Sequence, residues 1–112
     1  MAMNSVALGT NVVLRKLVWG TSDTASLQND YADGFDVIIG ADIIYIEDSI
    51  QPMFVTVSAV LSSAPTAVFL LAYARRNVPI QKVLDCAQSF GFGWECPAGA
   101  EGIYIFRRNT PA

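Results

Sequence analysis

The sequence predicts an α/β fold in which helices pack on a mostly parallel sheet that ends in an antiparallel β-hairpin. Apolar runs of strand length alternate with longer segments whose apolar residues recur at helical spacing, and this alternation is typical of parallel sheets joined by helices. Two short apolar runs, separated by a turn that contains Pro and Gly, follow at the C-terminal end and indicate the hairpin. A chain of 112 residues has room for one domain, so we expect residues 1–112 to form a single unit.

The first predicted elements are a strand and a long loop. Residues 11–19 are mostly apolar and predict a strand that stops at Gly20. Residues 21–34 are rich in Ser, Thr, Asp and Asn, so we expect a loop there. The next strand contains a β-branched run at residues 37–39, which is typical of a strand covered on both faces.

Two helices and three strands are predicted downstream. Apolar residues at helical spacing follow Asp48 and Ser49, either of which can cap that helix. A second helical pattern follows Asn77, which can cap it, and stops at Gly91. Strands are expected at residues 67–73, 92–96 and 103–107, with a turn at residues 97–100 between the last two.

The composition excludes several classes of site. The chain has no histidine, which removes Ser-His-Asp and Cys-His catalysis and any His-ligated metal. The net charge is −3 and the basic residues form no run, so no nucleic-acid surface is expected. Cys86 and Cys96 match no zinc or redox motif, so we expect no metal site and two free thiols, as in the reducing cytoplasm.

We expect neither a membrane span nor a signal peptide. Residues 49–74 carry no charge, but Gln51, Pro52 and the loop-like residues 62–66 interrupt the apolar stretch. The first 14 residues lack a basic start followed by an apolar block.

The sequence Gly40-Ala41-Asp42 directly follows the β-branched run and indicates a ligand site. Ligands of open α/β sheets bind outside the carboxyl ends of the strands. Two small side chains would let a ligand approach the backbone, with the Asp42 carboxylate beside it. A second interpretation, in which Asp42 only caps the next turn, fits the pattern equally well.

Two motifs resemble a known enzyme family. Asp42-Ile43-Ile44-Tyr45 is similar to the Asp-x-x-Tyr motif after the fourth strand of seven-β-strand (class I) S-adenosylmethionine-dependent methyltransferases, specifically the protein-lysine methyltransferases. Leu17-Val18-Trp19-Gly20 resembles the Leu-x-Trp-Gly end of their third strand. The order of the later elements is also similar, so the resemblance covers nearly the whole chain.

The chain also departs from the family's pattern. No Gly-x-Gly turn precedes Trp19, although the family places such a turn after its first strand to bind the cofactor. The chain therefore resembles the C-terminal half of such an enzyme, with a partial Rossmann-like sheet. Val18 stands where the family often has an Asp that is available to the adenine amino group.

The resemblance implies S-adenosylmethionine as cofactor and a protein lysine as methyl acceptor. It places Trp19 on or near the adenine, although simple core packing is an alternative for this residue. It places Ala41 along the methionine end of the cofactor. Asp42 would face the target amine, orient it or help it to lose its proton, and Tyr45 would brace the motif or touch the substrate.

The resemblance also implies a substrate mouth at the end of the following strand. Tyr73 and Arg75 lie there and could line it. A solvated loop is the alternative for Arg75. The substrate protein itself is not indicated by any motif.

The missing half of the fold has a physical consequence. In the family's sheet the fourth strand is central and lies beside the first, which this chain lacks. Long apolar edges pair with another strand, so we expect self-association through this edge, or residues 11–19 in the vacant place.

Three functions remain open from the sequence. The first is part of a protein-lysine methyltransferase that is active only with its N-terminal half. The second is a non-catalytic interaction domain that self-associates through its sheet. The third is a receiver-like signalling domain, because Val37-Ile38-Ile39 and Asp42 also resemble a phospho-acceptor strand, although nothing acidic precedes Asp23 to hold Mg²⁺.

Overall fold

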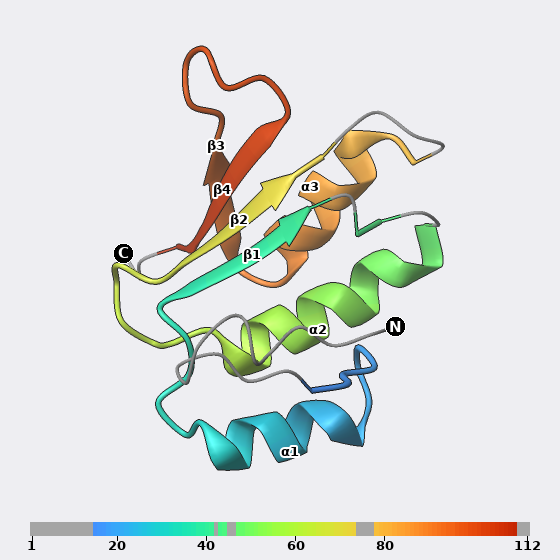
Figure 1. The fold of residues 1–112 in the computed structure, drawn as a ribbon. Coiled ribbons are helices and arrows are strands. Elements are labelled where there is room, and N and C mark those ends of the chain that lie inside the picture. Colours follow the sequence, from blue (N-terminus) through green and yellow to red (C-terminus); the bar gives the residue numbers. More distant parts are fainter. Residues whose placement is uncertain (1–14, 42, 45–46, 74–77, 110–112) are drawn as a thin grey trace, which may run out of the picture.

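The computed structural model describes residues 15–41, 43–44, 47–73 and 78–109. Within these residues four strands form one sheet in the order β1-β2-β4-β3. Helices α2 and α3 lie on one face of this sheet, and α1 packs against α2 (Figure 1). The elements are α1 (Ser22–Asp30), β1 (Val37–Ala41), the short 3₁₀ helix η2 (Glu47–Ser49), α2 (Ile50–Val60), β2 (Val68–Ala72), α3 (Ile80–Ser89), β3 (Phe92–Glu95) and β4 (Ile103–Arg108).

The predicted α/β fold class is confirmed, with a sheet that is mixed. β1 and β2 pair in parallel and are joined by α2 in a β-α-β unit. β4 inserts between β2 and β3 and runs antiparallel to both, which confirms the predicted C-terminal antiparallel pair. The described strands therefore contain one parallel and two antiparallel pairings.

The core lies between the sheet and the helices α2 and α3. Phe54 on α2 is fully buried at its centre. Its ring lies 5.6 to 6.1 Å, centroid to centroid, from four other phenylalanine rings. These rings come from β2, from the end of α3, from β3 and from β4, so one side chain links most of the elements: Phe69, Phe90, Phe92 and Phe106.

The prediction of a loop over residues 21–34 is wrong, because most of this segment forms α1. Thr21 is the N-cap of the helix, and its hydroxyl oxygen accepts a hydrogen bond from the backbone N–H of Asp23. The Gln28 side chain ties the other end to α2 by donating to the Ala59 carbonyl at 2.8 Å. Residues such as Ser, Thr and Asp favour both loops and helix caps, and here they cap a polar surface helix.

The predicted strand over residues 11–19 is absent from its described part. Residues 15–18 belong to no strand, and Trp19 and Gly20 lie in a turn; residues 11–14 are outside the described part of the chain. The backbone of Val18 bonds locally instead of joining a ladder. Its N–H donates to the Asp23 carboxylate at 2.9 Å, and its carbonyl accepts from the Thr21 hydroxyl at 2.6 Å.

The prediction that β1 is covered on both faces is also wrong. Among the described strands β1 pairs only with β2 and forms an edge of the sheet. The side chains of Val37 and Ile39 are 51% and 73% exposed, because α2 and α3 both cover the opposite face (Figure 1). A β-branched run is typical of a central strand, and β1 has such a sequence although the described residues place a strand on only one side of it.

Candidate functional site

The carboxyl ends of β1 and β2 meet at one edge of the sheet. The two strands are parallel, and Ala41 lies opposite Ala72 in the ladder. Ala41 is exposed and Ala72 is half-buried, so two small side chains form a shallow platform on the face of the sheet that α2 and α3 leave open. This is the place where open α/β sheets bind ligands. Asp42 and Tyr45, the predicted catalytic residues, come directly after β1 in the sequence but lie outside the described residues.

Tyr73 follows β2 and joins three parts of the fold at this edge. It is 7% exposed, and its hydroxyl donates a hydrogen bond to the Val78 carbonyl just before α3. Its backbone N–H donates to the Gly102 carbonyl at 2.8 Å, in the loop between β3 and β4. Burial raises the pKa of the Tyr73 phenol above its ordinary value, and the nearby Tyr104 adds to the rise.

The geometry of Tyr73 gives it a clear structural role at the edge. Its side chain ties the end of β2 to the start of α3. A contact between Tyr73 and the substrate stays a prediction. Arg75, the second predicted substrate-binding residue, lies outside the described residues.

Trp19 lines an apolar hollow beside β1. The hollow has a volume of about 420 Å³ and lies between β1, α2 and the segment that carries Leu17 and Trp19. Ile39 and Ile43 also line it, whereas Ala41 between them does not. Trp19 thus lies beside β1, the strand that carries Ala41, but the two residues do not line the same hollow. Trp19 is half-buried and packs against the core, as its alternative interpretation requires.

A glycine explains how the chain turns at Trp19. Gly20 has a φ of +72°, a backbone conformation that residues with a side chain rarely adopt. A Cβ added at Gly20 would lie 3.2 Å from the Cβ of Pro52 on α2. The Trp-Gly pair of the sequence motif is therefore a tight turn held against α2.

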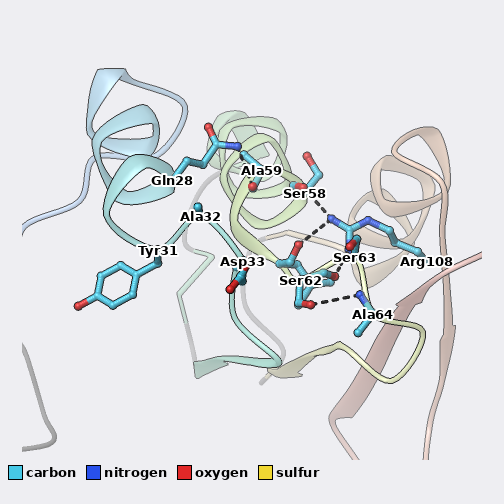
Figure 2. A pocket seen from close by; sticks show the side chains of 12 residues that line it. Gln28, Tyr31, Ala32, Asp33, Ser58, Ala59, Ser62, Ser63, Ala64 and Arg108 are labelled. Atoms are coloured by element: carbon cyan, nitrogen blue, oxygen red, sulfur yellow. Dashed lines mark hydrogen bonds between the residues drawn. The ribbon is translucent and has the colours of Figure 1, made fainter.

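A second, polar hollow lies at the opposite ends of the strands. Figure 2 shows it between α1, the end of α2 and Arg108, with a volume of about 530 Å³. The Arg108 guanidinium donates to the carbonyls of Ser58, Leu61 and Ser62 at 2.7, 3.1 and 2.6 Å. It thereby satisfies carbonyls at the C-terminal end of α2, which helices leave unpaired. We therefore assign Arg108 to the fold and the candidate site to the carboxyl ends of β1 and β2.

Other kinds of site are not formed by the described residues. No three Cys, Asp or Glu side chains in the described ranges lie close enough to hold a metal ion. Cys86 and Cys96 are both free thiols, and burial raises the pKa of Cys86. Of the helices that the structure describes, none has the length and apolar character that crossing a membrane requires.

A comparison with models of known protein families shows to which family this chain belongs. A family model described as lysine methyltransferase matches residues 1–89. The chain belongs to this lysine methyltransferase family. Among curated proteins no relative matches the chain.

The match covers most of this chain, residues 1–89 of 112. It includes the Trp19–Gly20 turn, β1, the Asp42-x-x-Tyr45 motif and β2, and it ends with α3 at Ser89. The β3–β4 hairpin lies outside the match but completes the same sheet. Membership places the chain in a family of S-adenosylmethionine-dependent methyltransferases.

Sequence reasoning missed one feature of the site and one of the fold that supports it. The pairing of Ala41 with Ala72 depends on strand register, which the pattern of apolar residues does not specify at the end of a strand. The role of Arg108 depends on a contact between segments 50 residues apart. A cation close to a helix C-terminus is the signal that could have indicated this role of Arg108. The two come close in the folded chain but are far apart in the sequence.

Proposed function

We propose that this chain helps to transfer a methyl group from S-adenosylmethionine to the side-chain amine of a protein lysine. The observation that carries the proposal is the platform of Ala41 and Ala72, at the carboxyl ends of two parallel strands. It lies within the part of the chain that matches the lysine methyltransferase family, and Asp42 follows it directly.

Each residue of the proposed site has a role that fits its chemistry. When bound, the cofactor supplies a methyl group on a positively charged sulfur. Ala41 and Ala72 leave room for that group to approach the backbone, and Trp19 offers an indole face to the adenine. The Asp42 carboxylate would accept a hydrogen bond from the neutral lysine amine, orient its lone pair and stabilise the positive charge that develops on nitrogen.

Calorimetric titration with S-adenosylhomocysteine tests whether the chain carries part of a cofactor site. We expect the wild-type chain to bind this product. We expect the Ala41→Leu variant to lose the binding, because the larger side chain would occupy the space above the platform. Ala25→Leu is the matched control, since Ala25 is exposed on α1. Absence of heat from the wild-type chain at millimolar ligand would contradict a cofactor site in this molecule.

The choice of lysine as acceptor needs its own test. Peptides that differ only in one nucleophilic residue, lysine or arginine, can be offered together with cofactor labelled on its methyl group. We expect label on the lysine peptide, and loss of that label in Asp42→Asn. Label on the arginine peptide alone would contradict the lysine proposal while leaving methyl transfer intact.

We also propose that the chain self-associates through the free edge of β1. The Asp36 carbonyl accepts from the Val68 N–H of β2 at 3.0 Å. In a parallel ladder bonding alternates along the strand, so the backbone groups of Val37, Ile39 and Ala41 point away from β2. Two copies related by a two-fold axis at Ile39 would match these three residues with one another in an antiparallel pair.

A further inference from the structure

Two buried hydroxyl groups meet between α1 and α2. Thr24 and Thr56 are only 6% and 4% exposed, and their Oγ1 atoms lie 3.1 Å apart. They are the polar side chains that the described part of the chain buries most deeply. Buried hydroxyls need hydrogen-bond partners, so this pair fixes how the two helices face each other.

The same pair also holds the turn that carries Trp19. The backbone N–H of Gly20 donates to Thr56 Oγ1 at 2.9 Å. Pro52, one helical turn before Thr56, contacts Gly20 on the same face of α2. The Gly20 backbone therefore lies directly on α2, and Thr56 joins it to Thr24.

The residue on the other side of Trp19 is fixed as well. The Val18 N–H donates to the Asp23 carboxylate, and the Val18 carbonyl accepts from the Thr21 hydroxyl. Asp23 and Thr21 belong to the start of α1, next to Thr24. The backbone on both sides of Trp19 is thus tied to the two helices that the hydroxyl pair joins.

We propose that the Thr24–Thr56 pair is a positioning device that sets the place of the Trp19 indole at the wall of the apolar hollow. This inference rests on the proposed function, in which the indole receives the adenine. Thr56 also lines this hollow, whereas Thr24 is not among its lining residues. Thr56 holds the backbone of Gly20 directly, and Thr24 acts through Thr56. Hydrogen bonds in a buried network depend on one another, so removal of one hydroxyl releases the turn.

The test uses the full 112-residue chain with Trp94→Phe, so that Trp19 is the remaining tryptophan. Thr56→Val keeps the volume of the side chain but removes the acceptor for Gly20. We expect Thr56→Val to make Trp19 more accessible to quenching by acrylamide and to weaken binding of S-adenosylhomocysteine about tenfold, the effect of one lost buried hydrogen bond. Thr56→Ser retains the hydroxyl and should restore both values.

Two controls separate positioning from folding. Ser58→Ala removes a hydroxyl on the same helix that donates to the Val55 carbonyl, within α2 itself. This substitution should change neither the quenching of Trp19 nor the binding of S-adenosylhomocysteine. If Thr56→Val does not fold, Thr24→Val replaces it, because it removes the pair but leaves the acceptor for Gly20. Failure of both variants to fold would assign the pair to general stability and overturn the proposal.

The remaining outcomes are also decisive. Unchanged shielding of Trp19 in a folded Thr56→Val variant would overturn the proposal. If the wild-type chain binds no S-adenosylhomocysteine, the proposed function fails for this molecule, while the quenching of Trp19 still decides whether the pair positions the indole.

Discussion

The guanidinium of Arg108 lies 2.7 Å from the carbonyl oxygen of Ser58, although 50 residues separate the two in the chain. Arg108 ends the last strand, and Ser58 lies in the last turn of α2. The contact places a cation at the negative end of the helix dipole. It also joins the β3–β4 hairpin, which lies outside the family match, to the β1-α2-β2 unit inside it.

Replacement of Arg108 by Gln should therefore destabilise the fold. We expect a loss of about 1 kcal/mol in the free energy of unfolding, because the side chain is exposed and water can replace part of its bonding. Urea denaturation measures this loss. Arg107→Gln is the matched control: Arg107 pairs with Glu95 at the surface, and its replacement should cost less than about 0.5 kcal/mol. Equal losses in both variants would contradict the assignment of Arg108 to the end of α2.

The buried phenol of Tyr73 predicts how stability depends on alkaline pH. Its pKa is raised in the folded chain by burial and by Tyr104, so the unfolded chain loses the phenolic proton first as pH rises. The stabilisation is complete below the ordinary tyrosine pKa of about 10 and is lost above it. We expect the urea midpoint to fall more steeply between about pH 9 and 11 in the wild type than in Tyr73→Phe.

The Tyr73→Phe variant also tests the hydrogen bond that the phenol donates. At neutral pH, Tyr73→Phe should itself cost about 1 kcal/mol, because the Val78 carbonyl loses its donor. A steep alkaline slope that persists in Tyr73→Phe would show that another group causes it.

The edge of β1 predicts a concentration-dependent assembly. We expect the wild-type chain to sediment as a dimer in analytical ultracentrifugation, and Ile39→Lys to sediment as a monomer. A lysine here should block strand pairing, because the two-fold axis at Ile39 would place two like charges directly opposite each other. Val55→Lys is the control, since Val55 is exposed and lies on α2 rather than on a strand. A wild-type chain that stays monomeric at high concentration would contradict self-association.

Much of the fold could be predicted because its signals are local. The helix over Ile50–Val60 and the strand over Val68–Ala72 follow directly from the spacing of their apolar residues. α1 was missed because its polar sequence has no apolar residues at helical spacing. A capping residue such as Thr21 does not by itself distinguish a helix from a loop. The exposure of Ile39 could not be read from its own sequence, since it depends on which face of the sheet the helices cover.

The candidate site was predictable only in part, for a related reason. Gly40-Ala41-Asp42 indicated the carboxyl end of a strand, and Gly20 indicated only that the segment before it ends after Trp19. The partners of these residues come from distant segments, such as Ala72 for Ala41 and Thr56 for Gly20. Such pairs are created by register and helix packing, which the local pattern does not specify.

The last prediction concerns Gly34, where the chain enters β1. Gly34 has a φ of +76°, and an added Cβ would lie 2.8 Å from the backbone of Ser62 and from the Val60 carbonyl. This close approach allows Phe35 to form a bridge with Leu61 and so sets where β1 begins. Gly34→Ala should therefore cost about 3 kcal/mol, the sum of backbone strain and a steric clash that only movement of the backbone can relieve.

Gly99 is the matched control for this substitution. It has a φ of +79°, close to that of Gly34, but an added Cβ would meet no atom within 4 Å. Gly99→Ala should therefore show the strain alone, at about 1 kcal/mol. The difference between the two variants, measured by urea denaturation, isolates the contact of Gly34 with the end of α2. Equal losses would mean that the chain can shift away from Ser62, and that β1 does not depend on this contact for its position.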